Sequence, residues 1–235
     1  MKKLYEKTEL GFALVWIGIY CLGMSVFDGI SVALGAENAA TALFALIVSL
    51  FLLFWLRRQG LAERFGLCRA KAPAKVFCFY IPLALITLYN LWLGVGLRYG
   101  ALETVSYVVK MLCVGFLEEV IFRGFLFRMM AKNGVKSAII VSALTFGIGH
   151  IVNLLNGAAL IPTLMQTCYA TAIGYLFVII FHKSKSLVPC IITHCLVNSL
   201  SVFNVENNLS LYIAPVFLTI IPLAYAIYIN KKIIE

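Results

Sequence analysis

Charge is scarce in this sequence. Charged residues make up 12% of its 235 residues and hydrophobic residues make up 63%, whereas an ordinary soluble domain has about 25% and about 45–50%. The mean hydropathy is +0.99. A chain with so few polar side chains cannot cover the surface of a water-soluble globule, and a soluble protein is therefore excluded. The composition predicts an all-α integral membrane protein.

The sequence also lacks the patterns through which cysteines form disulfides or bind zinc. Its seven cysteines are odd in number, most of them lie within apolar runs, and they form no Cys-x-x-Cys or Cys/His finger motif. A disulfide framework and a thiolate zinc site are therefore not expected. The cysteines are interpreted as small apolar residues in helix packing.

Eight apolar runs divide the chain, and each is interpreted as a helix that crosses the membrane, since about 20 apolar residues span the hydrocarbon core. Eight spans leave no room for a sizeable soluble domain, so residues 1–235 are expected to form a single transmembrane domain. The runs are Leu10–Phe27, Ala39–Leu56, Val76–Leu97, Ser106–Met129, Ser137–Leu155, Leu160–Phe181, Leu187–Phe203 and Leu209–Ile229.

The net charge of +9 comes from loops rather than from a basic domain. If the N-terminus is cytoplasmic, 16 of the 19 basic residues fall in segments on the cytoplasmic side, as the positive-inside rule requires. Both termini are therefore expected to be cytoplasmic. The basic loops are interpreted as topology determinants that contact membrane lipid, and no nucleic-acid partner is expected. Lys2 and Lys3 precede the first run as in a secretory signal, but that run is longer than the apolar region of a signal, so we expect it to be retained.

Three of the runs contain polar residues, although a charge at the bilayer centre costs at least about 2.5–3.5 kcal/mol and by default indicates function. Because residues four apart share a helix face, Glu119 and Arg123 are expected to form a structural ion pair. Glu118 points elsewhere and needs a partner from another span, for which only His150 and His194 are ionisable and deep enough. The polar residues are Glu118, Glu119 and Arg123 in the fourth run, His150 and Asn153 in the fifth, and His194 and Asn198 in the seventh.

A carboxylate, two imidazoles and an amide in a dry pocket suit amide hydrolysis. Glu118 and an imidazole can deprotonate a water, while the second imidazole and an amide donate hydrogen bonds to the developing oxyanion. Glu118, His150 and His194 could instead bind Zn²⁺ with water as the fourth ligand, and the sequence does not choose between these. Phe146 is expected to pack beside the site, and Asn153 to support it. Gly147 and Gly149 would allow close approach by another helix or by a substrate backbone.

The ordered motifs Glu-Glu-x-x-x-Arg at 118–123, Phe-x-x-x-His at 146–150 and His-x-x-x-Asn at 194–198 resemble those of the CAAX protease and bacteriocin-processing (CPBP, or Abi) family of intramembrane endopeptidases. The resemblance covers residues 106–203, which are expected to form the catalytic core. It implies that Glu118 and His150 activate the water and that His194 and Asn198 stabilise the oxyanion. The family is often labelled a metalloprotease family, but a metal-free glutamate mechanism is also proposed for it; we favour the latter, with no cofactor required and zinc as the alternative.

The expected substrate is a membrane-associated peptide or protein, of the CAAX type or a bacteriocin or leader peptide, and the expected location is the bacterial plasma membrane. A peptide exporter or a sensor kinase is a candidate partner. Two functions outside this class remain open. One is a non-catalytic bacteriocin self-immunity or regulatory protein on the same fold. The other is a proton-coupled transporter, whose relays also use Glu and His within spans, although the chain is short and lacks internal repeats.

Overall fold

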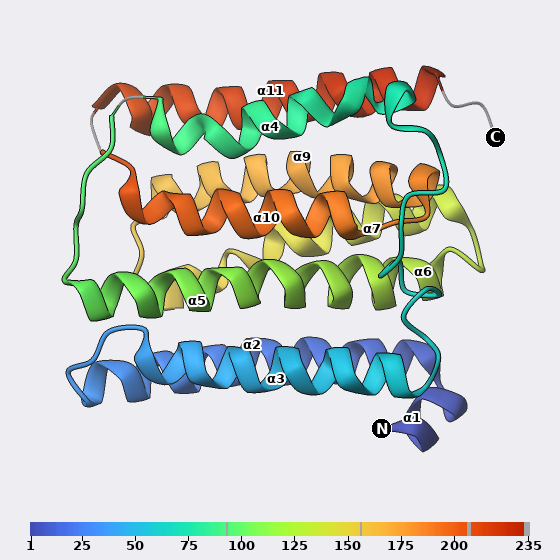
Figure 1. The fold of residues 1–235 in the computed structure, drawn as a ribbon, viewed down its shortest axis with the longest axis horizontal. Helices are drawn as coiled ribbons and strands as arrows, with labels where there is room; N and C mark the ends of the chain where they lie inside the picture. Colours follow the sequence, from blue (N-terminus) through green and yellow to red (C-terminus); the bar gives the residue numbers. More distant parts are fainter. Residues whose placement is uncertain (93, 156, 206–207, 233–235) are drawn as a thin grey trace.

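The computed structural model describes residues 1–92, 94–155, 157–205 and 208–232, and within them the chain is helical without a β-strand. Figure 1 shows long helices that run back and forth along one axis. The elements are α1 Lys2–Lys7, α2 Glu9–Ala33, α3 Ala39–Arg58, η1 Ala74–Tyr80, α4 Ile81–Leu88, η2 Tyr89–Leu91, α5 Ala101–Glu118, η3 Glu119–Phe127, α6 Arg128–Met130, α7 Val135–Gly149, α8 Val152–Leu155, α9 Leu160–Ser184, α10 Val188–Leu200, η4 Ser201–Phe203 and α11 Asn208–Lys232.

All eight apolar runs contain helix, which confirms the prediction of an all-α polytopic membrane protein. Among the described residues, six helical stretches are long and apolar enough to cross a membrane. The other two are the shorter Val188–Phe203 and the fourth run, which carries the intramembrane charges. Helix α1 and the C-terminal end of α11 lie at the same end of the bundle (Figure 1). A count of eight crossings and the cytoplasmic location of the termini stay predictions.

The third run ends differently from the prediction. We expected one helix over Val76–Leu97, but helical turns end at Leu91. Gly94 then adopts a φ of +118°, which favours glycine over residues with a side chain, and Val95 forms an isolated antiparallel bridge with Asn204. The apolar character of this stretch does not indicate that the backbone leaves the helix there.

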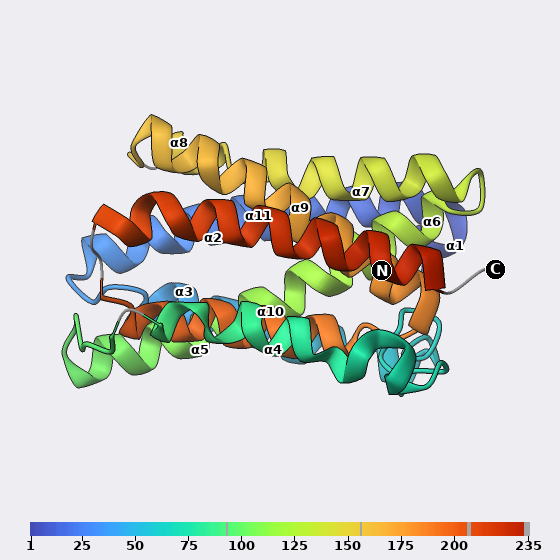
Figure 2. The same ribbon diagram turned by 90° about the horizontal axis from the view of Figure 1, so that it is seen from above.

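The helices form two layers, which Figure 2 shows from above. One layer contains α3, α5, α10 and α4, which contact one another in that order, and the other contains α7, α9 and α11 together with α2. The segment η3 is a π-helix that passes from the first layer toward the second, and all nine of its residues are buried. Because π-helical turns are rare and frequent at functional sites, η3 marks the part of the fold that holds the site.

A glycine allows α5 and α10 to approach each other beside this π-helix. A Cβ atom on Gly115 would lie 2.7 Å from the backbone nitrogen of Cys195 and 2.9 Å from its Cα, which is closer than real Cβ contacts. Gly115 is three residues before Glu118, and Cys195 follows His194. The missing side chain at Gly115 therefore brings the backbones that carry Glu118 and His194 together.

Candidate active site

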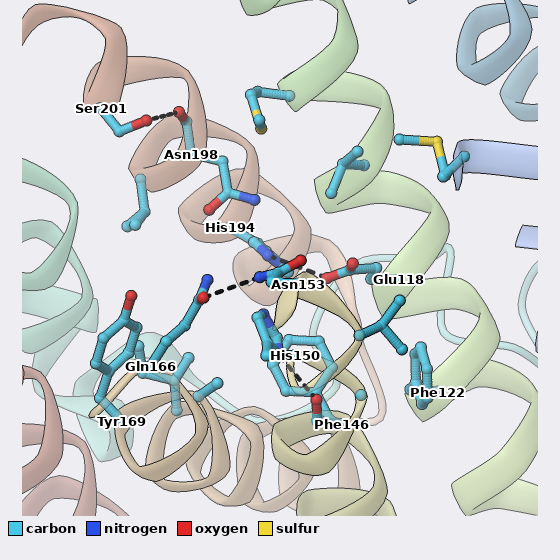
Figure 3. Close-up of a pocket in the computed structure, with 18 of the residues that line it drawn as sticks. Glu118, Phe122, Phe146, His150, Asn153, Gln166, Tyr169, His194, Asn198 and Ser201 are labelled. Atoms are coloured by element: carbon cyan, nitrogen blue, oxygen red, sulfur yellow. Dashed lines mark hydrogen bonds and ion pairs between the residues drawn. The ribbon is translucent and has the colours of Figure 1, made fainter. Parts of the chain in front are cut away.

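A cavity of about 400 Å³ lies between the two layers and is lined by residues from both. Its walls include all four residues that the sequence predicts to be catalytic, namely Glu118, His150, His194 and Asn198. Figure 3 shows these side chains around one space, contributed by three different parts of the chain. The structure thus brings together polar groups that are up to 80 residues apart in sequence.

His194 is the side chain that joins the two adjacent glutamates. Its Nδ1 lies 2.9 Å from Oε1 of Glu119, and its Nε2 lies 3.5 Å from Oε2 of Glu118. Only 9% of the residue is exposed. A doubly protonated imidazole donates through both nitrogens, so the ring can serve both carboxylates at once. The contact with Glu119 fixes the orientation of the ring and directs Nε2 toward Glu118.

Glu119 and Arg123 form the predicted ion pair, even though they lie on a π-helix. Nη1 of Arg123 is 3.0 Å from Oε1 of Glu119, and both side chains are fully buried. The guanidinium carbon of Arg123 also lies 3.8 Å from the centre of the Phe146 ring, a cation–π contact. Oε1 of Glu119 contacts both Arg123 and His194. The ion pair is therefore in direct contact with a residue of the cavity.

Phe146 packs between the two histidines, as expected for a residue beside the site. Its ring meets those of His150 and His194 edge to face, with centroids 5.2 and 5.8 Å apart, and it contacts Phe122 in the same way at 5.7 Å. These rings form one wall of the cavity. The polar groups there lie in an environment of low dielectric constant, which strengthens their mutual interactions.

His150 takes a position that the motif spacing did not predict. Helix α7 ends at Gly149, so His150 occupies the C-cap, and its Nδ1 lies 3.0 Å from the backbone oxygen of Phe146. Within the described residues, no hydrogen bond or ion pair joins His150 to Glu118, although both line the cavity. The imidazole in contact with Glu118 is that of His194, whereas the resemblance pairs Glu118 with His150.

The structure adds two polar residues that the sequence analysis missed. Nδ2 of Asn153 donates a hydrogen bond to Oε1 of Gln166 at 3.0 Å, and the hydroxyl of Tyr20 donates one to Oε1 of Glu118. Both Gln166 and Tyr20 line the cavity. Each is a polar residue within an apolar run, a signal that the sequence analysis overlooked because it singled out only charged groups, histidines and two asparagines.

Two glycines beside His150 have different surroundings. A Cβ atom on Gly147 would overlap with Thr171 and lie 2.8 Å from the backbone oxygen of Thr167. A Cβ atom on Gly149 would have no atom within 4 Å. Gly147 therefore serves the close packing of α7 on α9. Gly149 lines the cavity and leaves space there.

The geometry does not match a zinc site made by Glu118, His150 and His194. Within the described parts of the chain, no group of three or more His, Cys, Asp and Glu side chains is arranged to hold a metal ion. Nδ1 of His150 faces a carbonyl of its own helix, and both nitrogens of His194 face glutamates. We therefore derive no catalytic step through a metal.

A multi-pass helical membrane protein with a carboxylate, two imidazoles and an amide around an internal cavity has the features of an intramembrane hydrolase. Residues 100–200 match the family model described as Rce1-like, type II CAAX prenyl endopeptidase. All three motifs lie within the matched residues, and the match agrees with the family resemblance that the motifs indicate. At the level of the family, the match supports a CAAX-type intramembrane endopeptidase. No curated protein and no solved structure matched the chain.

Proposed function

We propose that the protein is an endopeptidase that hydrolyses a peptide bond of a membrane-associated peptide or protein inside the cavity. The observation that carries this proposal is the contact between Glu118 and His194 in a cavity that His150 and Asn198 also line. Ionisable groups are costly within a membrane, and packing alone does not account for a carboxylate, two imidazoles and an amide around one space.

In the proposed reaction, Glu118 accepts a proton from a water whose oxygen attacks the carbonyl carbon of the scissile bond. His194 is held through Nδ1 by Glu119. Once Glu118 has taken the proton, Nε2 of His194 donates to the oxyanion instead of contacting Glu118, and Asn198, one helical turn further along α10, donates a second hydrogen bond. The carbon–nitrogen bond then breaks, and the proton passes from Glu118 to the departing amine. His150 lies in the same cavity and assists this proton transfer.

The proposed substrates are a CAAX-type protein or a bacteriocin or leader peptide in the bacterial plasma membrane, with a peptide exporter or sensor kinase as a candidate partner. The purified protein in proteoliposomes is expected to cleave a prenylated C-terminal peptide or a leader peptide, with fragments identified by mass spectrometry. Proton flux that depends on the peptide, without fragments, would instead indicate a transporter. Peptide binding without fragments would indicate an immunity or regulatory protein.

Replacing Asn198 with alanine is expected to lower kcat by about 10²–10³-fold, because the amide is proposed to donate to the oxyanion, and loss of one such donor has effects of this size. The measurement is the rate of peptide cleavage at saturating substrate. Asn133→Ala is a matched control, since Asn133 is exposed in the turn after α6 and lies outside the cavity. An unchanged kcat for Asn198→Ala would refute the oxyanion role.

Treatment with a strong chelator is expected to leave activity unchanged, because the proposed steps use only side chains. The protein is dialysed against the chelator, its metal content is measured by elemental analysis, and cleavage is assayed on the same sample. Stoichiometric zinc whose removal abolishes cleavage, with recovery on adding zinc, would establish a metalloprotease and replace the proposed mechanism.

A further inference from the structure

The carboxylate of Glu118 is held from two sides. The hydroxyl of Tyr20 donates a hydrogen bond to Oε1, and Nε2 of His194 lies 3.5 Å from Oε2. The two donors come from α2 and α10, which belong to different layers of the bundle. A carboxylate whose two oxygens each meet a separate donor cannot rotate freely about its Cγ–Cδ bond.

Tyr20 differs from the other site residues because it lies outside the segment of residues 100–200 that matches the family model. It is in the middle of α2, only 9% of it is exposed, and it packs in the cluster that contains Leu117 and Val120 on either side of the glutamates. The ring is therefore fixed by apolar contacts, and its hydroxyl emerges at the wall of the cavity.

We propose that Tyr20 is a positioning residue that orients the carboxylate of Glu118 toward the attacking water. This proposal rests on the proposed function, in which Glu118 is the base. An ionised carboxylate offers about four lone-pair sites, so the hydrogen bond from Tyr20 and the ion-pair contact with His194 leave sites free to receive the proton of the water. By fixing which of these sites face the cavity, Tyr20 acts on the reaction through Glu118 and without touching the substrate.

Tyr20→Phe removes the hydroxyl and keeps the ring. We expect kcat to fall by about 10–100-fold, the size of effect that follows from losing a hydrogen bond to a charged group, while KM stays within about twofold of the wild-type value because substrate contacts are unchanged. In a Glu118→Gln background, Tyr20→Phe is expected to cause no further loss of the residual rate, since it acts through the missing carboxylate.

Tyr225→Phe is the matched control. Tyr225 is also buried, with 5% exposed, and its hydroxyl donates to the backbone oxygen of Phe77 at 2.6 Å, but it does not line the cavity. Both variants are compared with the wild type by thermal unfolding. We expect Tyr225→Phe to keep kcat whatever it does to stability.

The outcomes separate the two proposals. Three results for Tyr20→Phe would overturn the positioning role and leave the proposed function intact. They are an unchanged kcat, a change in KM alone, and a fall in kcat that is equally large in the wild-type and Glu118→Gln backgrounds. A wild-type protein that cleaves no peptide, or a Glu118→Gln variant as active as the wild type, would overturn the proposed function and the positioning role together.

Discussion

Glu118→Gln is expected to lower kcat for peptide cleavage by about 10²–10⁴-fold, which is the typical contribution of a general base. Glutamine has nearly the same size as glutamate, and its carbonyl oxygen can still accept the hydrogen bond that Tyr20 donates. It cannot accept the proton of the attacking water. The fold should therefore persist while the chemical step is lost, and steady-state cleavage together with thermal unfolding measures both.

Glu103→Gln provides the control for this substitution. Glu103 lies in the first turn of the same helix α5, where its Oε2 accepts a hydrogen bond from the backbone nitrogen of Gly100 at 3.2 Å, and glutamine can accept the same bond. The activity of Glu103→Gln should equal that of the wild type.

His150→Ala is also expected to abolish proteolysis. A double variant of Glu118 and His150 that still cleaves peptide would refute the proposed mechanism.

The sequence predicts the arrangement of this protein well because the membrane limits the choices. A chain with 12% charged residues can place them only at helix ends or in pairs, so the apolar runs and the pair of Glu119 and Arg123 can be read from spacing alone. The presence of Glu118, His150, His194 and Asn198 around one cavity follows the same logic, since polar groups within spans need each other as neighbours.

The individual contacts within the cavity cannot be predicted from charge and spacing, because they depend on where the backbone departs from an ideal α-helix. The π-helix that begins at Glu119 and the end of α7 at Gly149 both change the directions of side chains. The prediction used 1.5 Å per residue and 100° per residue throughout. It consequently offered His150 and His194 as partners for Glu118, but did not place His194 against both glutamates.

The sequence likewise does not predict contacts between residues that are far apart in the chain. Tyr20 meets Glu118 across 98 residues of sequence, and no periodicity within α2 distinguishes this tyrosine from one that lies at the membrane interface. Gly115 likewise gives no sign in the sequence that Cys195 will lie against it. Both contacts are set by how α2, α5 and α10 pack, which is a property of the whole bundle.

Arg123→Ala is expected to lower the free energy of unfolding by about 3–5 kcal/mol, because removing one partner of a buried ion pair leaves the other charge uncompensated. Among the described residues, Glu119 would then keep the contact with Nδ1 of His194 alone, and Phe146 would lose the guanidinium stacked on its ring. The measurement is reversible unfolding in mixed detergent micelles. Activity should fall as well, since Glu119 orients His194.

Two comparisons make this prediction specific to burial. Lys2 and Glu6 are also four residues apart, at 3.8 Å, but their side chains are 66% and 59% exposed, so Lys2→Ala should change stability little, as for surface pairs in general. A double variant with Glu119→Gln and Arg123→Met removes both charges and should be more stable than Arg123→Ala, because no charge remains unpaired. If Arg123→Ala unfolds within about 1 kcal/mol of the wild type, the buried ion pair contributes no more than an exposed pair and the prediction is refuted.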